Sequence, residues 1–313
     1  MDSFYVAVNA VLPFLIYILI GFIARRAGVT KESFLRELNS VVFKVFFPFI
    51  MFGNLYAADF GMLRNAGYVL FAVVATLIVI AVSFAVVPLF EKNDSRKGVL
   101  IQAIYRSNSV LFAIPLTQRV FGDAGAAKAS ILVAFVVPLY NITAVAVLEY
   151  FRGGKVSYRK LFVNILKNPL IIGAIAGVIF NLLPVTMPGC FQVPIKELSS
   201  LATPMALFVL GGTIHASDIK KNAAPLATCI LLKLVIIPIF IVSIASMMRY
   251  DPIEMFVIFS VFATPVAASS FPMAQSMGGD ADLAGEFVAL STGISIFTIF
   301  AWIMVLRGIF HIV

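Results

Sequence analysis

The sequence PLTQRVFGDA at residues 115–124 returns as PMAQSMGGDA at residues 272–281, and this recurrence decides how the chain folds. Five of the ten positions are identical, and the offset of 157 residues is about half of the 313-residue chain. A second pattern, GxxxAxD, occurs at residues 53–59 and again at residues 212–218. The chain therefore contains two similarly built halves, and paired halves in a strongly apolar chain are typical of secondary transporters.

The composition places most of the chain in lipid. Hydrophobic residues make up 61% of the sequence and charged residues 12%, and the mean hydropathy is +1.04. Soluble domains are nearer about half apolar and about a quarter charged. The formal charge of +8 does not predict binding to nucleic acid, because the basic residues lie in short loops between apolar runs. Cys190 and Cys229 have neither metal-site nor disulfide spacing.

Ten apolar runs are long enough to cross a bilayer, which takes about 20 helical residues. Five runs fall in each half, and an odd number per half means that similar halves enter the membrane from opposite sides. We expect an all-α membrane protein with ten transmembrane helices in two inverted repeats, residues 1–150 and 161–313, joined by a cytoplasmic linker at 151–160. The runs lie near residues 4–24, 37–57, 66–90, 98–119, 127–150, 161–183, 197–215, 222–248, 253–276 and 284–310.

The loop charges predict the orientation of these ten segments. One set of alternate loops holds 14 Lys and Arg residues, and the opposite set holds six. Because basic loops stay in the cytoplasm, both termini are expected outside, with the protein in the cell (inner) membrane.

Two segments carry polar residues and prolines that a continuous helix does not favour. Segment 4 contains Ser-Asn-Ser at 107–109 followed by Pro115, and segment 9 contains Thr-Pro at 264–265, Ser-Ser at 269–270 and then Pro272. A single proline is consistent with a simple kink, but matched breaks in both halves favour a binding site. We expect segments 4 and 9 to be broken and to cross.

Each break also has a chemical use. Proline fits the first turn of a helix, so Pro115 and Pro272 are expected to begin second half-helices. A helix start offers free backbone N–H groups and a partial positive charge, and two such starts would form a cradle for an anion. Asn108, Ser269 and Ser270 would add side-chain hydrogen bonds.

These residues resemble the auxin efflux carrier family, which includes plant auxin exporters and bacterial carriers of malonate-like acids. The resemblance covers almost the whole chain and is carried by Ser107-Asn108, Ile114-Pro115-Leu116 and Phe121-Gly122 in segment 4, Asn168-Pro169, Pro204-Met205-Ala206-Leu207, Leu210-Gly211-Gly212 and Phe47-Pro48. The chain lacks the long cytoplasmic loop of the plant exporters and looks like the short prokaryotic form.

The family resemblance implies a ten-helix inverted-repeat fold, like that of bile acid:sodium symporters, in which segments 4 and 9 cross as broken helices. It also implies a site at Asn108 and around Pro115, Pro265 and Pro272. Pro265 stands where the second repeat would match Asn108, so the polar pair is not symmetric. This departure disfavours a sodium site mirrored in both repeats.

Three basic residues, Lys44, Arg106 and Lys233, lie toward the interior of the predicted spans. A charge at the bilayer centre costs at least about 2.5–3.5 kcal/mol, so such residues should face protein or water. Lys44 is expected to reach the interface, and Lys233 to pair with a carboxylate or carbonyl or to contact substrate. Arg106 precedes the first break and is the best candidate for an anion partner, although it could instead bond the carbonyls freed there.

The sequence predicts a secondary carrier that moves a small organic carboxylate by alternating access, and the family resemblance implies efflux. A sodium-coupled symporter of the bile acid type and a membrane sensor or channel without alternating access are the alternatives. No catalytic motif occurs, so neither an enzyme nor a cofactor is expected. The expected partners are the organic anion and membrane lipid, with a homodimer left open. The predicted substrate-binding residues are Asn54, Arg106, Asn108, Ser109, Pro115, Pro265, Ser269, Ser270 and Pro272, and the predicted coupling or gating residues are Gln118, His215, Lys233 and Gln275.

Overall fold

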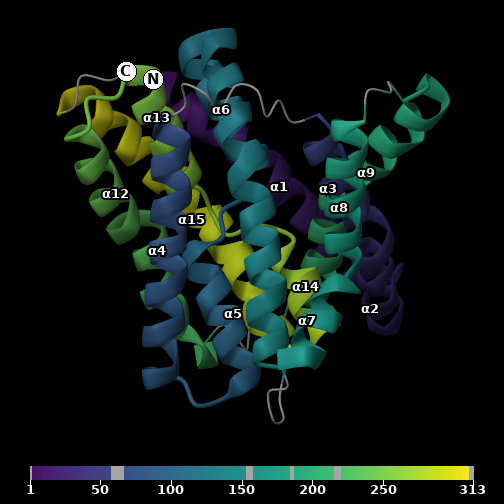
Figure 1. Ribbon diagram of the computed structural model, residues 1–313. Coiled ribbons are helices and arrows are strands. Elements are labelled where there is room, and N and C mark those ends of the chain that lie inside the picture. Colours follow the sequence, from purple (N-terminus) through teal and green to yellow (C-terminus); the bar gives the residue numbers. More distant parts are fainter. Residues whose placement is uncertain (1, 58–66, 153–157, 184–186, 215–219, 310–313) are drawn as a thin grey trace.

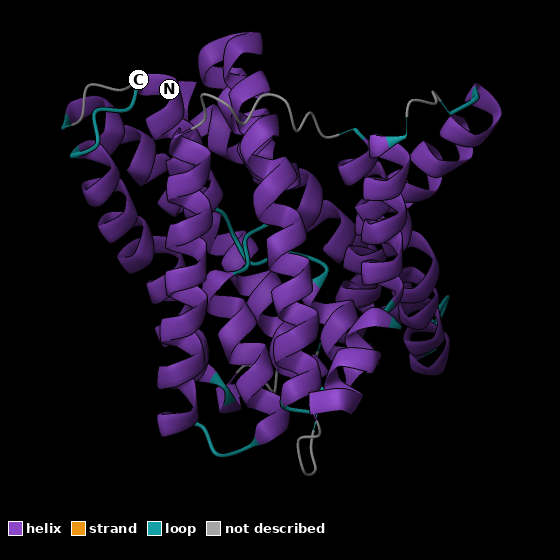
Figure 2. Ribbon diagram, in the orientation of Figure 1, coloured by secondary structure: helices purple, strands orange, loops and turns teal. Residues whose placement is uncertain are grey.

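The structure, a computed structural model, describes residues 2–57, 67–152, 158–183, 187–214 and 220–309, and every regular element in these stretches is a helix (Figures 1 and 2). Two short turns of π-helix, η1 and η3, interrupt longer helices. The elements are α1 (Asp2–Arg26), α2 (Glu32–Val41), η1 (Val42–Phe46), α3 (Phe47–Tyr56), α4 (Gly67–Phe90), α5 (Asp94–Tyr105), α6 (Ser109–Tyr150), α7 (Tyr158–Leu166), α8 (Pro169–Leu182), α9 (Gly189–Thr213), α11 (Ala223–Leu231), η3 (Leu232–Ile236), α12 (Ile237–Ser246), α13 (Pro252–Phe262), α14 (Ser270–Met277) and α15 (Ala281–Gly308).

Six of the described helical stretches are long and apolar enough to cross a membrane, which makes this a multi-pass membrane protein. The N-terminal and C-terminal ends lie at the same end of the helix bundle, and the connection from α4 to α5 lies at the opposite end (Figure 1). The six stretches are Glu32–Tyr56, Gly67–Phe90, Ser109–Tyr150, Gly189–Thr213, Ala223–Ser246 and Ala281–Gly308, and two shorter apolar helices are Pro169–Leu182 and Pro252–Phe262.

The helices pack as two groups. One group brings together α1, α2, α3, α8 and α9, and the other α4, α5, α6 and α11 to α15, with α1 also contacting α6 and α15 (Figure 1). Glycine permits the closest approaches within the first group. A Cβ atom on Gly21 or Gly211 would lie 1.9 or 1.8 Å from a backbone oxygen of the facing helix. Helices in lipid associate through close packing of this kind because lipid chains are themselves apolar.

Helix α6 turns back on itself at Gly122. The φ of Gly122 is 63° and its ψ is −151°, a conformation that in practice only glycine adopts. A Cβ atom on Gly125 would lie 2.6 Å from the backbone oxygen of Thr117, so the two arms are close together after the reversal. The 42 residues of α6 therefore belong to two successive segments, as the apolar runs 98–119 and 127–150 predict.

The two predicted helix breaks are confirmed. Residues 106–108 separate α5 from α6, and residues 263–269 separate α13 from α14. The two breaks pair with each other: the Asn108 N–H donates to the Pro265 carbonyl at 2.9 Å, and the Ala267 N–H donates to the Arg106 carbonyl at 3.3 Å. Ser107 and Val266 form an antiparallel bridge between these bonds. Backbone groups freed inside lipid need protein partners, and here each break supplies them to the other.

The prediction that Pro115 begins a second half-helix is wrong, whereas Pro272 does lie in the first turn of one. Helix α6 begins at Ser109, and Pro115 lies inside it, on an exposed face. Helix α14 begins at Ser270, so Pro272 occupies its third position. Ser and Asn side chains compete with the helix for backbone hydrogen bonds, and a residue before proline avoids the helical conformation. Because of these effects at 107–109 and 264–265, the breaks lie earlier in the sequence than Pro115 and Pro272 alone suggest.

Candidate functional site

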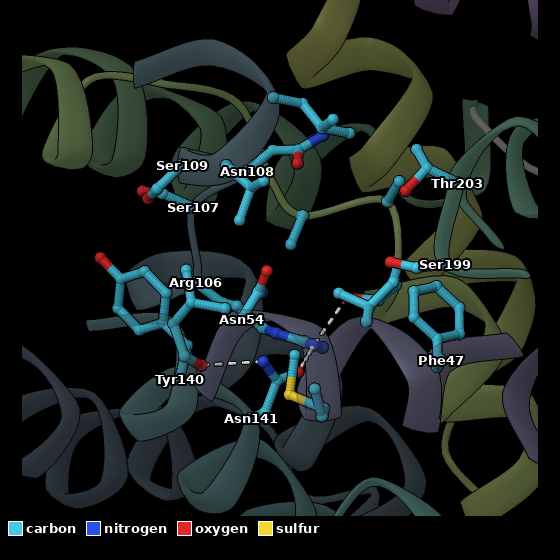
Figure 3. Close-up of a pocket in the computed structure, with 18 of the residues that line it drawn as sticks. Phe47, Asn54, Arg106, Ser107, Asn108, Ser109, Tyr140, Asn141, Ser199 and Thr203 are labelled. Atoms are coloured by element: carbon cyan, nitrogen blue, oxygen red, sulfur yellow. Dashed lines mark hydrogen bonds between the residues drawn. The ribbon is translucent and has the colours of Figure 1, made fainter. Parts of the chain in front are cut away.

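A cavity of about 410 Å³ lies beside the point where the two breaks cross. The start of α6 and residues 267–269, which lead into α14, form one side of it, and α1, α3 and α9 contribute other parts of the wall (Figure 3). The residues that line it are Pro13, Phe14, Tyr17, Phe47, Ile50, Met51, Asn54, Arg106, Ser107, Asn108, Ser109, Val110, Leu111, Val137, Tyr140, Asn141, Ser199, Ser200, Thr203, Pro204, Ala267, Ala268 and Ser269.

Arg106 is the single charged residue among the described residues that line this cavity. It is 1% exposed and immediately follows the last residue of α5. Its guanidinium donates to Ser269 Oγ at 2.6 Å, to Gln102 Oε1 at 3.3 Å and to Ser270 Oγ at 3.4 Å, and also to Asn141 Oδ1 (Figure 3). All four partners are neutral oxygens. No ion pair within the described stretches includes Arg106, so its positive charge is buried without a carboxylate.

Neutral polar side chains complete the cavity wall. Asn108 is the N-cap of α6, but its side chain makes no capping hydrogen bond, which leaves the amide available to a ligand. Asn54 of α3 presents a buried Nδ2 that has no hydrogen-bond partner in the described part of the chain. Ser199 and Thr203 of α9 lie across the cavity from Ser109 (Figure 3). An unpaired buried donor is costly, so such atoms indicate where a bound acceptor would be stabilised.

The electrostatics of this cavity favour an anion. Helix α6 begins at its wall, so the partial positive charge of a helix N-terminus adds to the guanidinium of Arg106. The described lining contains no Asp or Glu to offset that field. Arginine can bind a carboxylate through two parallel hydrogen bonds, which gives orientation as well as attraction.

The structure brings most of the predicted binding residues to this cavity. Asn54, Arg106, Asn108, Ser109 and Ser269 line it. Two more act from behind the wall, because Ser270 bonds the Arg106 guanidinium and Pro265 accepts the backbone bond from Asn108.

Other predicted residues lie elsewhere. Neither Pro115 nor Pro272 is part of the described lining. Gln118 is exposed and reaches Asp123 at 3.5 Å. Gln275 accepts a hydrogen bond from the buried Asn39 of α2, a contact between the two helix groups. Lys233 is buried behind the crossing, where it contacts the Tyr105 carbonyl and Ser107 rather than a carboxylate. His215 lies outside the described residues.

Sequence reasoning missed several lining residues. Tyr140 and Asn141 of α6 hold the side of the cavity next to Arg106, and Ser199, Ser200 and Thr203 come from α9. The available signal was a polar pair within the apolar run 127–150 and a polar cluster just before Pro204. Neither cluster can be assigned to the cavity without knowing which helices face it.

Apolar helices that break and cross beside a cavity with both polar and apolar lining define a membrane protein with a candidate binding site. The family described as "Membrane transport protein", that of the auxin efflux carriers, matches the chain twice, over residues 6–155 and 154–303. The chain therefore belongs to this family of membrane transport proteins. The two matches meet between α6 and α7, as expected for a chain built from two similar halves.

Three relatives match over nearly their whole length. An "Uncharacterized transporter" of Methanothermobacter thermautotrophicus is 26% identical over 95% of this chain and 98% of its own. A protein of Rhizobium meliloti described as "Putative malonate transporter" is 23% identical over 95% of both chains. An "Uncharacterized transporter" of Methanocaldococcus jannaschii is 20% identical over 95% of this chain and 98% of its own.

Proposed function

We propose that this protein is a secondary carrier that moves small organic carboxylates, of the malonate or auxin kind, across the cell membrane by alternating access. The observation that carries the proposal is Arg106, a buried cation that lines the cavity and has only neutral partners among the described residues. A bound carboxylate would supply the missing negative charge. The relative from Rhizobium meliloti named for malonate supports the same class of substrate.

The size and lining of the cavity support a small ligand. About 410 Å³ is within the range of about 300–1,000 Å³ usual for small-molecule sites. The apolar side chains of Phe14, Phe47 and Met51 would surround the carbon skeleton, while Arg106 and Asn108 would hold the carboxylate. Outward transport is proposed from the resemblance to auxin exporters.

We also propose ten membrane crossings arranged as two inverted five-helix repeats, with both termini outside the inner membrane. The reversal at Gly122 and the paired breaks support this arrangement. Further support comes from one end of the bundle. A Cβ atom on Gly278, just after α14, would lie 3.5 Å from Arg152 Cγ, and the Asp280 N–H donates to the Ser95 carbonyl at 2.9 Å. The connections that follow α4, α6 and α14, which the inverted topology assigns to the cytoplasm, therefore lie together.

Counterflow in proteoliposomes tests the carrier mechanism. Vesicles that contain the purified protein are loaded with unlabelled malonate and diluted into labelled malonate. A carrier is expected to accumulate label transiently, because its binding site returns loaded from either side. The controls are protein-free vesicles and vesicles loaded with choline chloride. If malonate and other small carboxylates bind but none shows counterflow, the protein is a sensor rather than a carrier.

A further inference from the structure

Lys233 is a buried lysine that the anion cavity does not use. It is 1% exposed, lies in η3 and is absent from the described cavity lining. Its ammonium donates to the backbone carbonyl of Tyr105 at 3.3 Å and to Ser107 Oγ. Neither partner carries a charge, and no ion pair in the described stretches includes Lys233. The lysine thus holds one edge of the break between α5 and α6.

The π-turn before Pro238 fixes the position of Lys233. Pro238 has no N–H, so it cannot donate to the carbonyl of Leu234, and the local turn widens until the Ile237 N–H donates to Leu232 instead. The indole of Trp302 in α15 donates to the freed Leu234 carbonyl at 2.9 Å. The π-turn is therefore fixed from both sides, and it aims Lys233 at the end of α5.

The end of α5 is a place where a cation is favourable. The last carbonyls of a helix have no partner within the helix and carry about half a negative charge. In secondary transporters, unwound carbonyls and half-helix C-terminal ends are the groups that coordinate a free sodium ion. Here the ammonium of Lys233 contacts a helix-terminal carbonyl and a hydroxyl, the same kinds of oxygen ligand.

We propose that Lys233 is a tethered cation that takes the place of a coupling sodium ion at the crossing of the two broken segments. This inference rests on the proposed carrier function and specifies how the carrier is coupled. The positive charge that holds the break is part of the chain, so it stays in place through the whole transport cycle. Carboxylate transport should therefore not require sodium.

Removing the side chain should turn the tethered site into a site for a free cation. Lys233→Ala is expected to lose thermal stability and to regain it in ethylammonium or propylammonium chloride, by about 2 °C or more, because a ligand that binds the folded state stabilises it. Trp302 is the chain's one tryptophan, so its fluorescence reports the melting next to the site. Tetramethylammonium, which has no N–H donor, should not rescue.

Lys44→Ala is the matched control for this substitution. Lys44 also lies in a π-turn that precedes a proline, but its side chain is exposed. Neither this variant nor the parent should be stabilised by ethylammonium. If Lys233→Ala cannot be purified alone, ethylammonium in the purification buffers should yield folded protein. Failure of every small alkylammonium ion and of sodium to restore it would overturn the proposal, as would full stability without added cation.

Transport supplies the second test and separates the two proposals. The parent should take up labelled malonate equally in sodium and choline chloride. Lys233→Ala should be slower by about tenfold or more and recover in ethylammonium. A strict sodium requirement in the parent would overturn the role of Lys233 while leaving the carrier function intact. Absence of transport in the parent would instead contradict the proposed function, and the melting experiment would still decide the role of Lys233.

Discussion

At the residue scale, the defining feature is a pair of buried cations at the three-residue break 106–108: Arg106 belongs to the break, and Lys233 contacts it. Arg106 and Lys233 are each 1% exposed, and their partners among the described residues are neutral oxygens. A buried charge is tolerated only when hydrogen bonds or an opposite charge compensate it. Arg106 lines the cavity and Lys233 does not, so the two charges have different roles. One is available to a ligand, and the other stabilises the backbone.

Arg106→Gln should weaken carboxylate binding severely, by about 1.5–3 kcal/mol, which is roughly 10- to 150-fold in Kd. Arg106→Lys should weaken it less, because lysine retains the charge but loses the two-pronged geometry. Titration of purified protein with malonate by calorimetry measures both. For every variant the affinity should fall as the pH drops through the pKa values of the acid itself. Unchanged affinity in Arg106→Gln would show that Arg106 is structural.

Asn108→Ala should reduce binding by about 1–3 kcal/mol and leave folding nearly unchanged. The backbone bond from Asn108 to Pro265 does not depend on the side chain, and the amide caps no helix. Expression and melting temperature check the folding, and malonate titration checks the binding. Asn9→Ala, a change in an amide that bonds the Tyr5 carbonyl outside the cavity, is the control. Full transport by folded Asn108→Ala protein would refute the assigned site.

At the element scale, the two helix breaks were predictable, but the residues at which the next helices begin were not. Polar residues and a Thr-Pro pair inside apolar runs identified both breaks from sequence alone. Pro115 was a poor guide to the start of α6, because a proline inside a helix removes one backbone hydrogen bond without necessarily ending the helix. The π-turns also escaped sequence reasoning, although both precede a proline, at Pro48 and Pro238. Which turn widens depends on contacts such as Trp302 with Leu234.

The reversal at Gly122 gives a stability prediction for one element. Gly122→Ala should lower stability by about 1–3 kcal/mol, because a side chain is strained at this φ and ψ. Gly53→Ala is the control, since a Cβ atom there meets nothing within 4 Å and alanine favours the helix. Melting temperatures in one detergent compare the two variants with the parent. Equal melting of Gly122→Ala and the parent would contradict the strained geometry.

The start of α13 gives a prediction for pH. Burial alone would raise the pKa of Asp251, but hydrogen bonds from Lys128 and from the Glu254 backbone lower it below its ordinary 3.8. A lowered carboxyl pKa adds stability that is present above about pH 4 and is lost as the pH falls toward the folded-state value. Asp251→Asn retains a capping side chain without the charge. Its melting temperature should therefore decline less than that of the parent between about pH 5 and pH 3. Parallel declines would count against the ion pair.

At the scale of the whole molecule, two helix groups meet around a cavity whose wall comes from both halves of the sequence. The repeat made the double architecture predictable, because recurrence at half length needs no knowledge of packing. The predicted residues that line the cavity are mostly at a break, namely Arg106, Asn108, Ser109 and Ser269, with Asn54 of α3 in addition. Asn141 and Thr203 lie on continuous helices, and their facing direction depends on how those helices pack.

Accessibility from each side of the membrane tests the whole topology. In a background without Cys190 and Cys229, single cysteines replace the exposed Asp94 and Asp282, which the inverted arrangement assigns to the cytoplasm. A third cysteine replaces the exposed Lys196, which it assigns to the outside. An impermeant maleimide applied to intact cells should label the third position alone. Labelling of the first two from outside would reverse the topology, and labelling of just one of them would contradict the five-plus-five repeat.

The pairing of the two breaks has a consequence for how the protein is made. Ser269, which bonds the Arg106 guanidinium, follows it by 163 residues, and the Pro265 carbonyl that satisfies Asn108 lies in the same late stretch. While the ribosome is still translating the first half, these partners do not exist. Gln102 and Asn141 of the first half can already bond the guanidinium, but the early segment must wait beside water or the insertion machinery without its remaining hydrogen-bond partners. The membrane-embedded fold closes only when the second half arrives, so the two halves mature together.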